Sequence, residues 1–78
     1  VMSEKTQILF IQTRLIRFAS EKWNTTIIKA NAIFAKYNIF KFIEECFEEF
    51  GAEGDEAVLE DIELLLHNLG VEIDSENN

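Results

Sequence analysis

The stretch Ile39–Phe50, which reads IFKFIEECFEEF, decides the fold class of this chain. At 3.6 residues per turn, the apolar side chains fall on one side of a helix. The central stripe consists of Ile39, Ile43, Cys46 and Phe50, and the rings of Phe42 and Phe47 lie beside it. The opposite side carries four carboxylates: Glu44, Glu45, Glu48 and Glu49. The spacing therefore predicts an amphipathic helix with an apolar inner face and an acidic outer face.

A long helix is predicted upstream, from about Thr6 to Lys22, with Ser3 or Thr6 as its cap. Apolar residues recur at three- and four-residue steps along it: Ile8, Ile11, Leu15 and Phe18. Three further apolar residues make this stripe wider than one neighbouring helix can cover: Leu9, Phe10 and Ile16. We therefore expect this helix to be central in the fold or partly buried in another chain.

A second helix is predicted after the connection 23–25, beginning at the cap Thr26 and running through Tyr37. Asn38 follows at the position where a left-handed residue ends a helix, and Asn tolerates that conformation. Gly51 is expected to end the Ile39–Phe50 helix in the same way.

The final helix is expected to begin at Gly54 or Asp55, although Asp61 offers an alternative start, and to close at Gly70. Its predicted inner stripe and flanking residues are apolar: Val58, Ile62, Leu65 and Leu69, with Leu59 and Leu66 alongside. Together these signals predict an all-α fold, a compact bundle of about four short helices. We expect a single domain over residues 1–78, ordered over about 5–70, with 71–78 as a frayed acidic tail.

Composition narrows the chemistry of this 78-residue chain. The single cysteine excludes an internal disulfide framework, and the single histidine leaves no cluster for structural zinc. We predict no cofactor and no metal site. No apolar run is long enough to cross a bilayer, and the start lacks the basic-then-apolar pattern of a signal peptide, so a cytoplasmic protein is expected.

Charge divides the chain into two halves. Residues 1–41 hold all seven basic residues against two acids, a net charge of +5, whereas residues 42–78 hold thirteen acids and no base. One interpretation is that the halves attract each other across the fold. The other is that the acidic surface serves a basic partner.

Catalytic candidates are few. His67 is expected to be a surface or capping residue in the last helical turn, and Cys46 a buried structural thiol. Glu63 precedes His67 by four residues, but a single such pair is a weak signal. The tight turn before Ile39 resembles a helix-turn-helix, yet four glutamates on the second helix would repel phosphates. A small-ligand pocket among the aromatic residues is a further alternative.

Three segments together resemble a family of small bacterial proteins called domain of unknown function 3791, over roughly 8–70. The first segment is an apolar helix that ends near Trp23-Asn24 and is followed by the cap Thr26. The second is a helix with Ala30, Phe34 and Tyr37 that leads through a turn to Ile43-Glu44-Glu45. The third is Leu59-Glu60-Asp61-Ile62, in a final helix that closes at Gly70. The family usually has a His-Thr-Gln-Gly turn where this chain has Gly51-Ala52-Glu53-Gly54. No role of that His or Thr therefore carries over. The resemblance implies that this protein accompanies a neighbouring toxin-like protein, and some such toxin-like proteins are similar to ADP-ribosyltransferases.

These signals favour a non-enzymatic protein-interaction module, and the family resemblance implies that it neutralises a toxin-like partner. The first alternative is a self-associating structural domain, a homodimer through the first helix. A DNA-binding regulator and a small-ligand binder are weaker alternatives. The candidate partner-binding residues come from the acidic face and the first helix: Glu44, Glu45, Glu48, Glu49, Phe10, Arg14 and Arg17.

Overall fold

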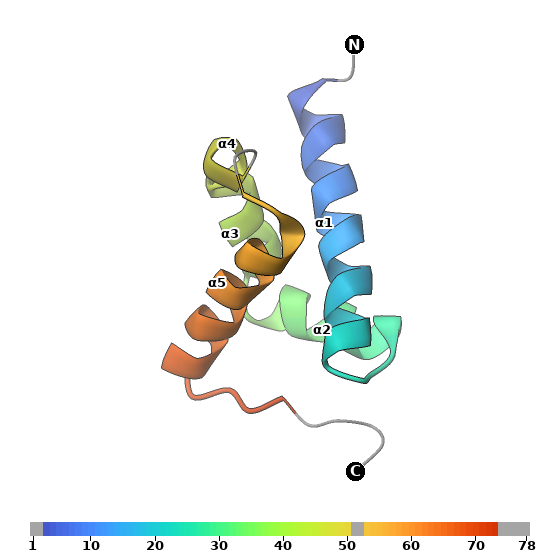
Figure 1. The fold of residues 1–78 in the computed structure, drawn as a ribbon, viewed down its shortest axis with the longest axis vertical. Helices are drawn as coiled ribbons and strands as arrows, with labels where there is room; N and C mark the ends of the chain where they lie inside the picture. The colour runs from blue at the N-terminus through green and yellow to red at the C-terminus, as the bar shows by residue number, and fades with distance from the viewer. Residues whose placement is uncertain (1–2, 51–52, 74–78) are drawn as a thin grey trace.

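Five helices succeed one another in the computed structural model, which describes residues 3–50 and 53–73 (Figure 1). They are α1 (Glu4–Lys22), α2 (Ile27–Lys36), α3 (Ile39–Glu45), α4 (Phe47–Phe50) and α5 (Asp55–Asn68). No strand occurs within the described residues, so the predicted all-α class is confirmed. The long α1 spans one side, α2 crosses near its C-terminal end, and α3 and α5 pack alongside (Figure 1).

Helix ends follow the capping signals of the sequence. Ser3 caps α1, because its Oγ accepts a hydrogen bond of 3.2 Å from the Thr6 backbone N–H, so α1 begins two residues before the predicted Thr6. Thr26 caps α2 in the same way, accepting from the Lys29 N–H at 3.1 Å. Helix α5 begins at Asp55 with Gly54 as its N-cap, which settles the choice between Asp55 and Asp61.

Left-handed residues end three of the helices. Asn24 has φ 53° after α1 and Asn38 has φ 57° between α2 and α3, so the prediction for Asn38 is confirmed. Gly70 has φ 79° after α5, where the Val71 N–H bonds to the Leu66 carbonyl at 2.9 Å. This pattern closes α5 as a Schellman motif, in agreement with the predicted stop. The predicted stop at Gly51 lies outside the described residues.

One prediction about the stretch Ile39–Phe50 is wrong, because it forms two helices rather than one. The break lies at Cys46, which has φ −103° and ψ 12°. In a straight helix Phe42 and Phe50 would be about 12 Å apart along the axis, at 1.5 Å per residue. Their ring centroids instead lie 5.6 Å apart, so the break lets Phe50 fold back onto Phe42 and become buried.

The core combines one stripe from each longer helix. The fully buried large side chains are Phe34, Leu15, Ile39, Ile43, Leu59, Ile62, Leu66 and Val58. The centroid of the Phe34 ring lies 6.1 Å from that of Trp23, in a tilted arrangement, and 5.6 Å from that of Phe40, in the edge-on arrangement that aromatic rings favour. Trp23, predicted only as part of a connection, is therefore a core residue.

Several burial predictions need correction. Cys46, at the break, and Phe47, at the start of α4, are half-buried rather than fully inside. On α5 the inner stripe runs through Val58, Ile62 and Leu66; Leu65 lies at its margin and is half-buried. Leu69 follows the last helical turn and is 55% exposed.

The chain stays packed for a short distance after Gly70. Val71 and Ile73 are half-buried and pack against the core, although both belong to the segment predicted as a frayed tail. The rest of that tail lies outside the described residues.

Candidate functional site

An acidic ridge runs along the outside of α3 and α4, and we define it as Glu44, Glu45, Glu48 and Glu49. All four side chains are exposed, as the sequence predicts. The break at Cys46 separates the first pair from the second, so the ridge bends with the chain. Carboxylates four residues apart on one helix repel each other, and the bend interrupts that regular spacing.

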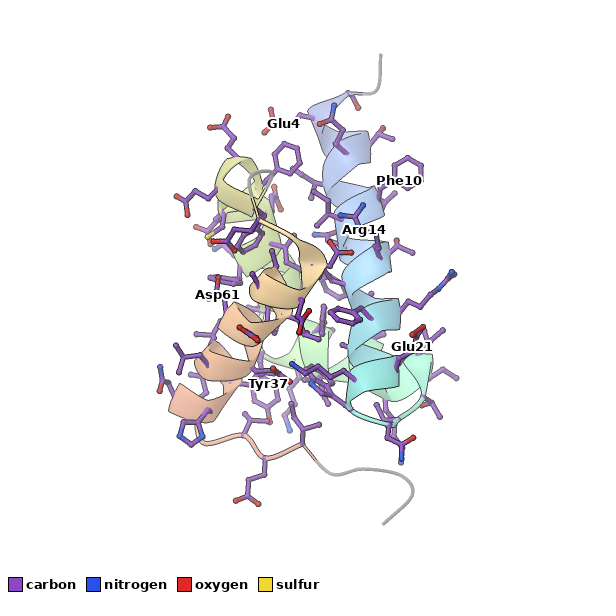
Figure 2. The ribbon with its side chains drawn as sticks, in the orientation of Figure 1. Glu4, Phe10, Arg14, Glu21, Tyr37 and Asp61 are labelled. Atoms are coloured by element: carbon purple, nitrogen blue, oxygen red, sulfur yellow. The ribbon has the colours of Figure 1, made fainter. Side chains whose placement is uncertain are left out.

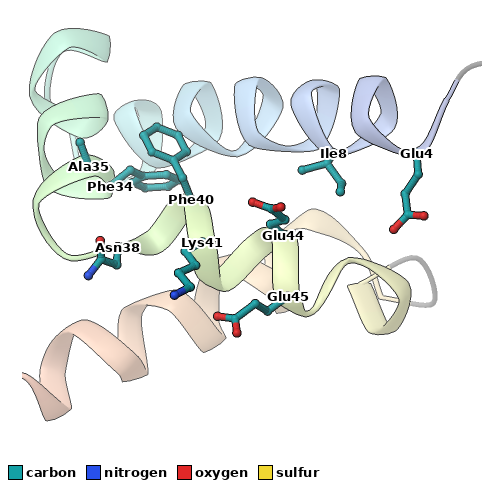
Figure 3. A pocket seen from close by; sticks show the side chains of 9 residues that line it. All are labelled: Glu4, Ile8, Phe34, Ala35, Asn38, Phe40, Lys41, Glu44 and Glu45. Carbon is teal, nitrogen blue, oxygen red and sulfur yellow. The ribbon is translucent and has the colours of Figure 1, made fainter.

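Beside this ridge lies a groove between the N-terminal half of α1 and α3, here called the α1–α3 groove (Figure 3). Its main hollow has a volume of about 760 Å³ and is lined by Glu4, Ile8, Phe34, Ala35, Asn38, Phe40, Lys41, Glu44 and Glu45. An adjoining hollow of about 600 Å³ shares Glu4, Ile8 and Glu44 with it. The two hollows are therefore one continuous feature with an apolar floor and charged walls.

The walls of this groove are held in place by the core and by a hydrogen bond between α1 and α3. The side-chain amide of Gln12 on α1 donates to the Phe40 carbonyl on α3 at 3.0 Å. Figure 3 shows Glu44 extending from α3 toward α1 beside Ile8, with Glu4 on the other side of Ile8. An apolar side chain thus lies between two carboxylates from different helices.

A different surface, on the outer side of α1 and the start of α2, is apolar. We call Phe10, Ile27 and Ile28 the α1–α2 patch; their exposed fractions are 56%, 53% and 81%. Two shallow hollows accompany the patch, and both are lined by Thr13 and Arg17. One hollow is lined by Ile27 and Ile28 and the other by Phe10, so these apolar side chains flank the shared residues Thr13 and Arg17.

Arg14, one of the predicted partner-binding residues, forms an ion pair within the fold. Its Nε lies 2.6 Å from Asp55 Oδ2 and its Nη2 lies 2.8 Å from Asp55 Oδ1, a bidentate ion pair between α1 and the first turn of α5. The hydrogen bond to Asp55 raises the pKa of the Arg14 guanidinium above its usual value. Figure 2 shows Phe10 pointing outward from α1 while Arg14 extends toward the start of α5. Arg17 is exposed beside the α1–α2 patch.

A second ion pair joins the same two helices nearer the end of α1. Lys22 Nζ lies 2.9 Å from Glu63 Oε1, and the Trp23 indole N–H donates to Glu63 Oε2 at 2.8 Å. The hydrogen bond to Glu63 raises the pKa of Lys22. Both ion pairs link a base of the first half to an acid of the second, which confirms the attraction across the fold that the charge division predicts.

The residues considered for catalysis are not brought together. His67 is exposed in the last turn of α5, and the Glu63 carboxylate contacts Lys22 and Trp23 instead. Desolvation, and then the nearby carboxylates of Glu49, Glu45 and Asp61, raise the pKa of the Cys46 thiol. Such a thiol is less ionised and less reactive than a free cysteine. Across residues 3–50 and 53–73, no cluster of three metal-ligating side chains occurs.

The predicted partner-binding residues thus fall into three groups, one of which, Glu48 and Glu49, is exposed on α4 and lines neither hollow. Glu44 and Glu45 line the α1–α3 groove, and Phe10, Arg14 and Arg17 line a hollow on α1. The sequence interpretation missed Glu4 and Lys41 in the groove.

This arrangement defines a small all-α helical protein with a groove and an exposed apolar patch. The family model for proteins of unknown function called DUF3791 matches residues 10–68, well over half of the chain, and the chain belongs to that family. No curated protein and no solved structure shows a significant match. Among the described residues, no helix is long and apolar enough to cross a membrane.

Proposed function

We propose that this protein is a non-enzymatic interaction module that binds another protein through the α1–α2 patch. The observation that carries this proposal is the patch itself, in which Phe10, Ile27 and Ile28 are each more than half exposed. Single exposed apolar residues are common, but a joined set on neighbouring helices is typical of a protein-binding surface. Arg17 beside the patch adds a residue type that protein interfaces favour.

The family resemblance favours a toxin-like protein, encoded beside this chain, as that partner, with neutralisation as the outcome of binding. This part of the proposal rests on the family and not on the geometry. The exposed position of His67 and the raised pKa of Cys46 also support a role without catalysis.

Co-expression with the product of the adjacent gene tests the proposal. We expect the two proteins to elute together from a sizing column, and we expect this chain to relieve growth arrest caused by the neighbour. Phe10→Glu with Ile28→Glu should abolish both effects without unfolding the protein, because both side chains are largely exposed. Leu64→Glu is the matched control, since Leu64 is 59% exposed on α5. If the unmodified proteins elute separately and arrest persists, the proposal fails.

Self-association is the second candidate, and the same patch favours it. Phe10 on α1 and Ile28 on α2 would be covered together if two copies packed their α1–α2 faces across a two-fold axis. Sedimentation at micromolar concentration distinguishes the candidates: a dimer that Ile28→Glu converts to monomers supports self-association, and a monomer at all concentrations rules it out.

A further inference from the structure

We propose that the α1–α3 groove is a second binding site, which takes a basic amphipathic helix from a partner protein. This inference rests on the proposed role as an interaction module, but it concerns a different surface from the α1–α2 patch. The groove and the patch share no lining residue: the groove is lined from α1 by Glu4, Lys5, Ile8, Leu9 and Gln12.

The shape of the groove suits a helix. Two helices, α1 and α3, form its walls, and Ile8 and Phe40 are the partly exposed apolar side chains that line it, with the buried Phe34 beneath them (Figure 3). A third helix laid between two others packs its apolar stripe against both, at axis separations of about 8–10 Å. An extended peptide would gain less, since the described part of the chain offers no strand to pair with.

The charge of the groove selects a basic occupant. Glu4 from α1 and Glu44 from α3 stand on either side of Ile8, and Glu45 also lines the groove, extending beside Lys41 (Figure 3). The remaining ridge residues, Glu48 and Glu49, continue the negative surface on α4. Two lysines, Lys5 and Lys41, also line the groove, but the three carboxylates outnumber them.

These features define the expected contacts. An apolar residue of the partner helix would pack on Ile8 and Phe40, and Lys or Arg residues one turn away would reach Glu4 and Glu44. A second copy of this chain is a poorer occupant, because each copy carries a net charge of −8 and the copies repel each other.

A labelled model peptide provides the probe. It is a helix of about 18 residues, roughly 27 Å long, with a leucine stripe and lysines on its flanks. Its control replaces every lysine with glutamate. In fluorescence anisotropy at about 0.15 M salt, where exposed charges are screened beyond about 8 Å, we expect the lysine peptide to bind at least about tenfold more tightly.

Matched variants of the protein locate the binding site. Glu4→Gln with Glu44→Gln removes two charges from the groove, and Glu48→Gln with Glu49→Gln removes two from the ridge outside it. We expect the first pair to weaken binding about tenfold and the second by less than about threefold. Circular dichroism checks that both remain folded, which their exposed positions favour.

Three results would overturn the inference. Equal losses for the two double variants would show diffuse attraction by the acidic half, and no loss for either would place the peptide elsewhere. If the peptide fails to bind while Glu44→Gln alters the sedimentation of the protein alone, the occupant is a second copy. The patch variant of Phe10 and Ile28 should bind the peptide normally, so failure here is distinguishable from failure of the proposed function.

Discussion

Glu63 joins α5 to the end of α1 through both of its carboxylate oxygens, one to Lys22 and one to Trp23. The two contacts differ in how much they contribute to the free energy of unfolding. The ion pair is partly exposed, and such pairs contribute about 0.2–1 kcal/mol. The Trp23 N–H belongs to a side chain that is only 7% exposed, so losing its acceptor leaves a donor without compensation.

We therefore expect Glu63→Ala to lower the free energy of unfolding by about 1–3 kcal/mol, and Glu63→Gln by less than about 1 kcal/mol. The amide oxygen of Gln still accepts from the indole, whereas Ala does not. Urea denaturation followed by circular dichroism measures both values. Glu60→Ala, at an exposed position of the same helix, is the control and should stay within about 0.5 kcal/mol. Equal losses for the two Glu63 variants would contradict the assigned hydrogen bond.

Cys46 carries a thiol whose ionisation is opposed by its surroundings. Its thiol pKa is raised above the ordinary value of 9.0, first by desolvation and then by Glu49, Glu45 and Asp61. Only the thiolate reacts with iodoacetamide, so alkylation of the folded protein should reach its half-maximal rate above pH 9.0. Glu49→Gln should move that midpoint down, because it removes a negative charge that opposes ionisation. A midpoint at or below the ordinary value would contradict the described surroundings.

At the scale of the helices, end signals were more informative than apolar stripes. Ser3, Thr26 and Asn38 all act where the sequence predicts, because caps depend on a few neighbouring backbone groups. The break at Cys46 was not predicted, since the stretch Ile39–Phe50 contains no Gly or Pro and keeps a helical period throughout. The break is accompanied by the contact between Phe42 and Phe50, which forms only in the folded core.

Asn38 tests the turn between α2 and α3. Its φ of 57° is tolerated by Asn and Gly but strained for a β-branched residue. We expect Asn38→Val to cost about 1–2 kcal/mol of unfolding free energy, while Asn38→Gly changes it by only a few tenths. Asn31→Val, at an exposed site within α2, controls for helix propensity and should cost less than about 0.7 kcal/mol. If Asn38→Val melts at the wild-type temperature, the left-handed turn is wrong.

Ile43 and Phe47 test the divided helix. Ile43 is fully buried and Phe47 is half-buried, although the sequence pattern treats both as inner residues. Ile43→Ala should therefore cost about 2–5 kcal/mol, a large share of the stability of so small a domain. Phe47→Ala should cost only about 1–2 kcal/mol, because part of its ring already contacts water. Thermal unfolding compares them, and a larger loss for Phe47→Ala would contradict the break at Cys46.

At the scale of the whole molecule, composition and periodicity predict the fold class and the exposed charges, but not which helix surfaces lie next to each other. The all-α class, the attraction between the two charged halves and the exposure of the acidic ridge all follow from residue order. The α1–α3 groove does not, because it depends on where α1 lies against α3. The pairing of Arg14 with Asp55, 41 residues away, likewise required the folded arrangement of α1 and α5.

The α1–α2 patch is the surface on which the proposed function depends, and its contribution to binding is the most direct test. Isothermal titration calorimetry of this protein with the adjacent gene's product gives the dissociation constant for wild type, for Phe10→Glu with Ile28→Glu, and for Leu64→Glu. We expect the patch variant to bind about 100-fold more weakly, because it loses two exposed anchor residues that the partner would cover, and the Leu64 control to stay within about twofold. Equal affinity of the patch variant and wild type would contradict the proposed function at this surface.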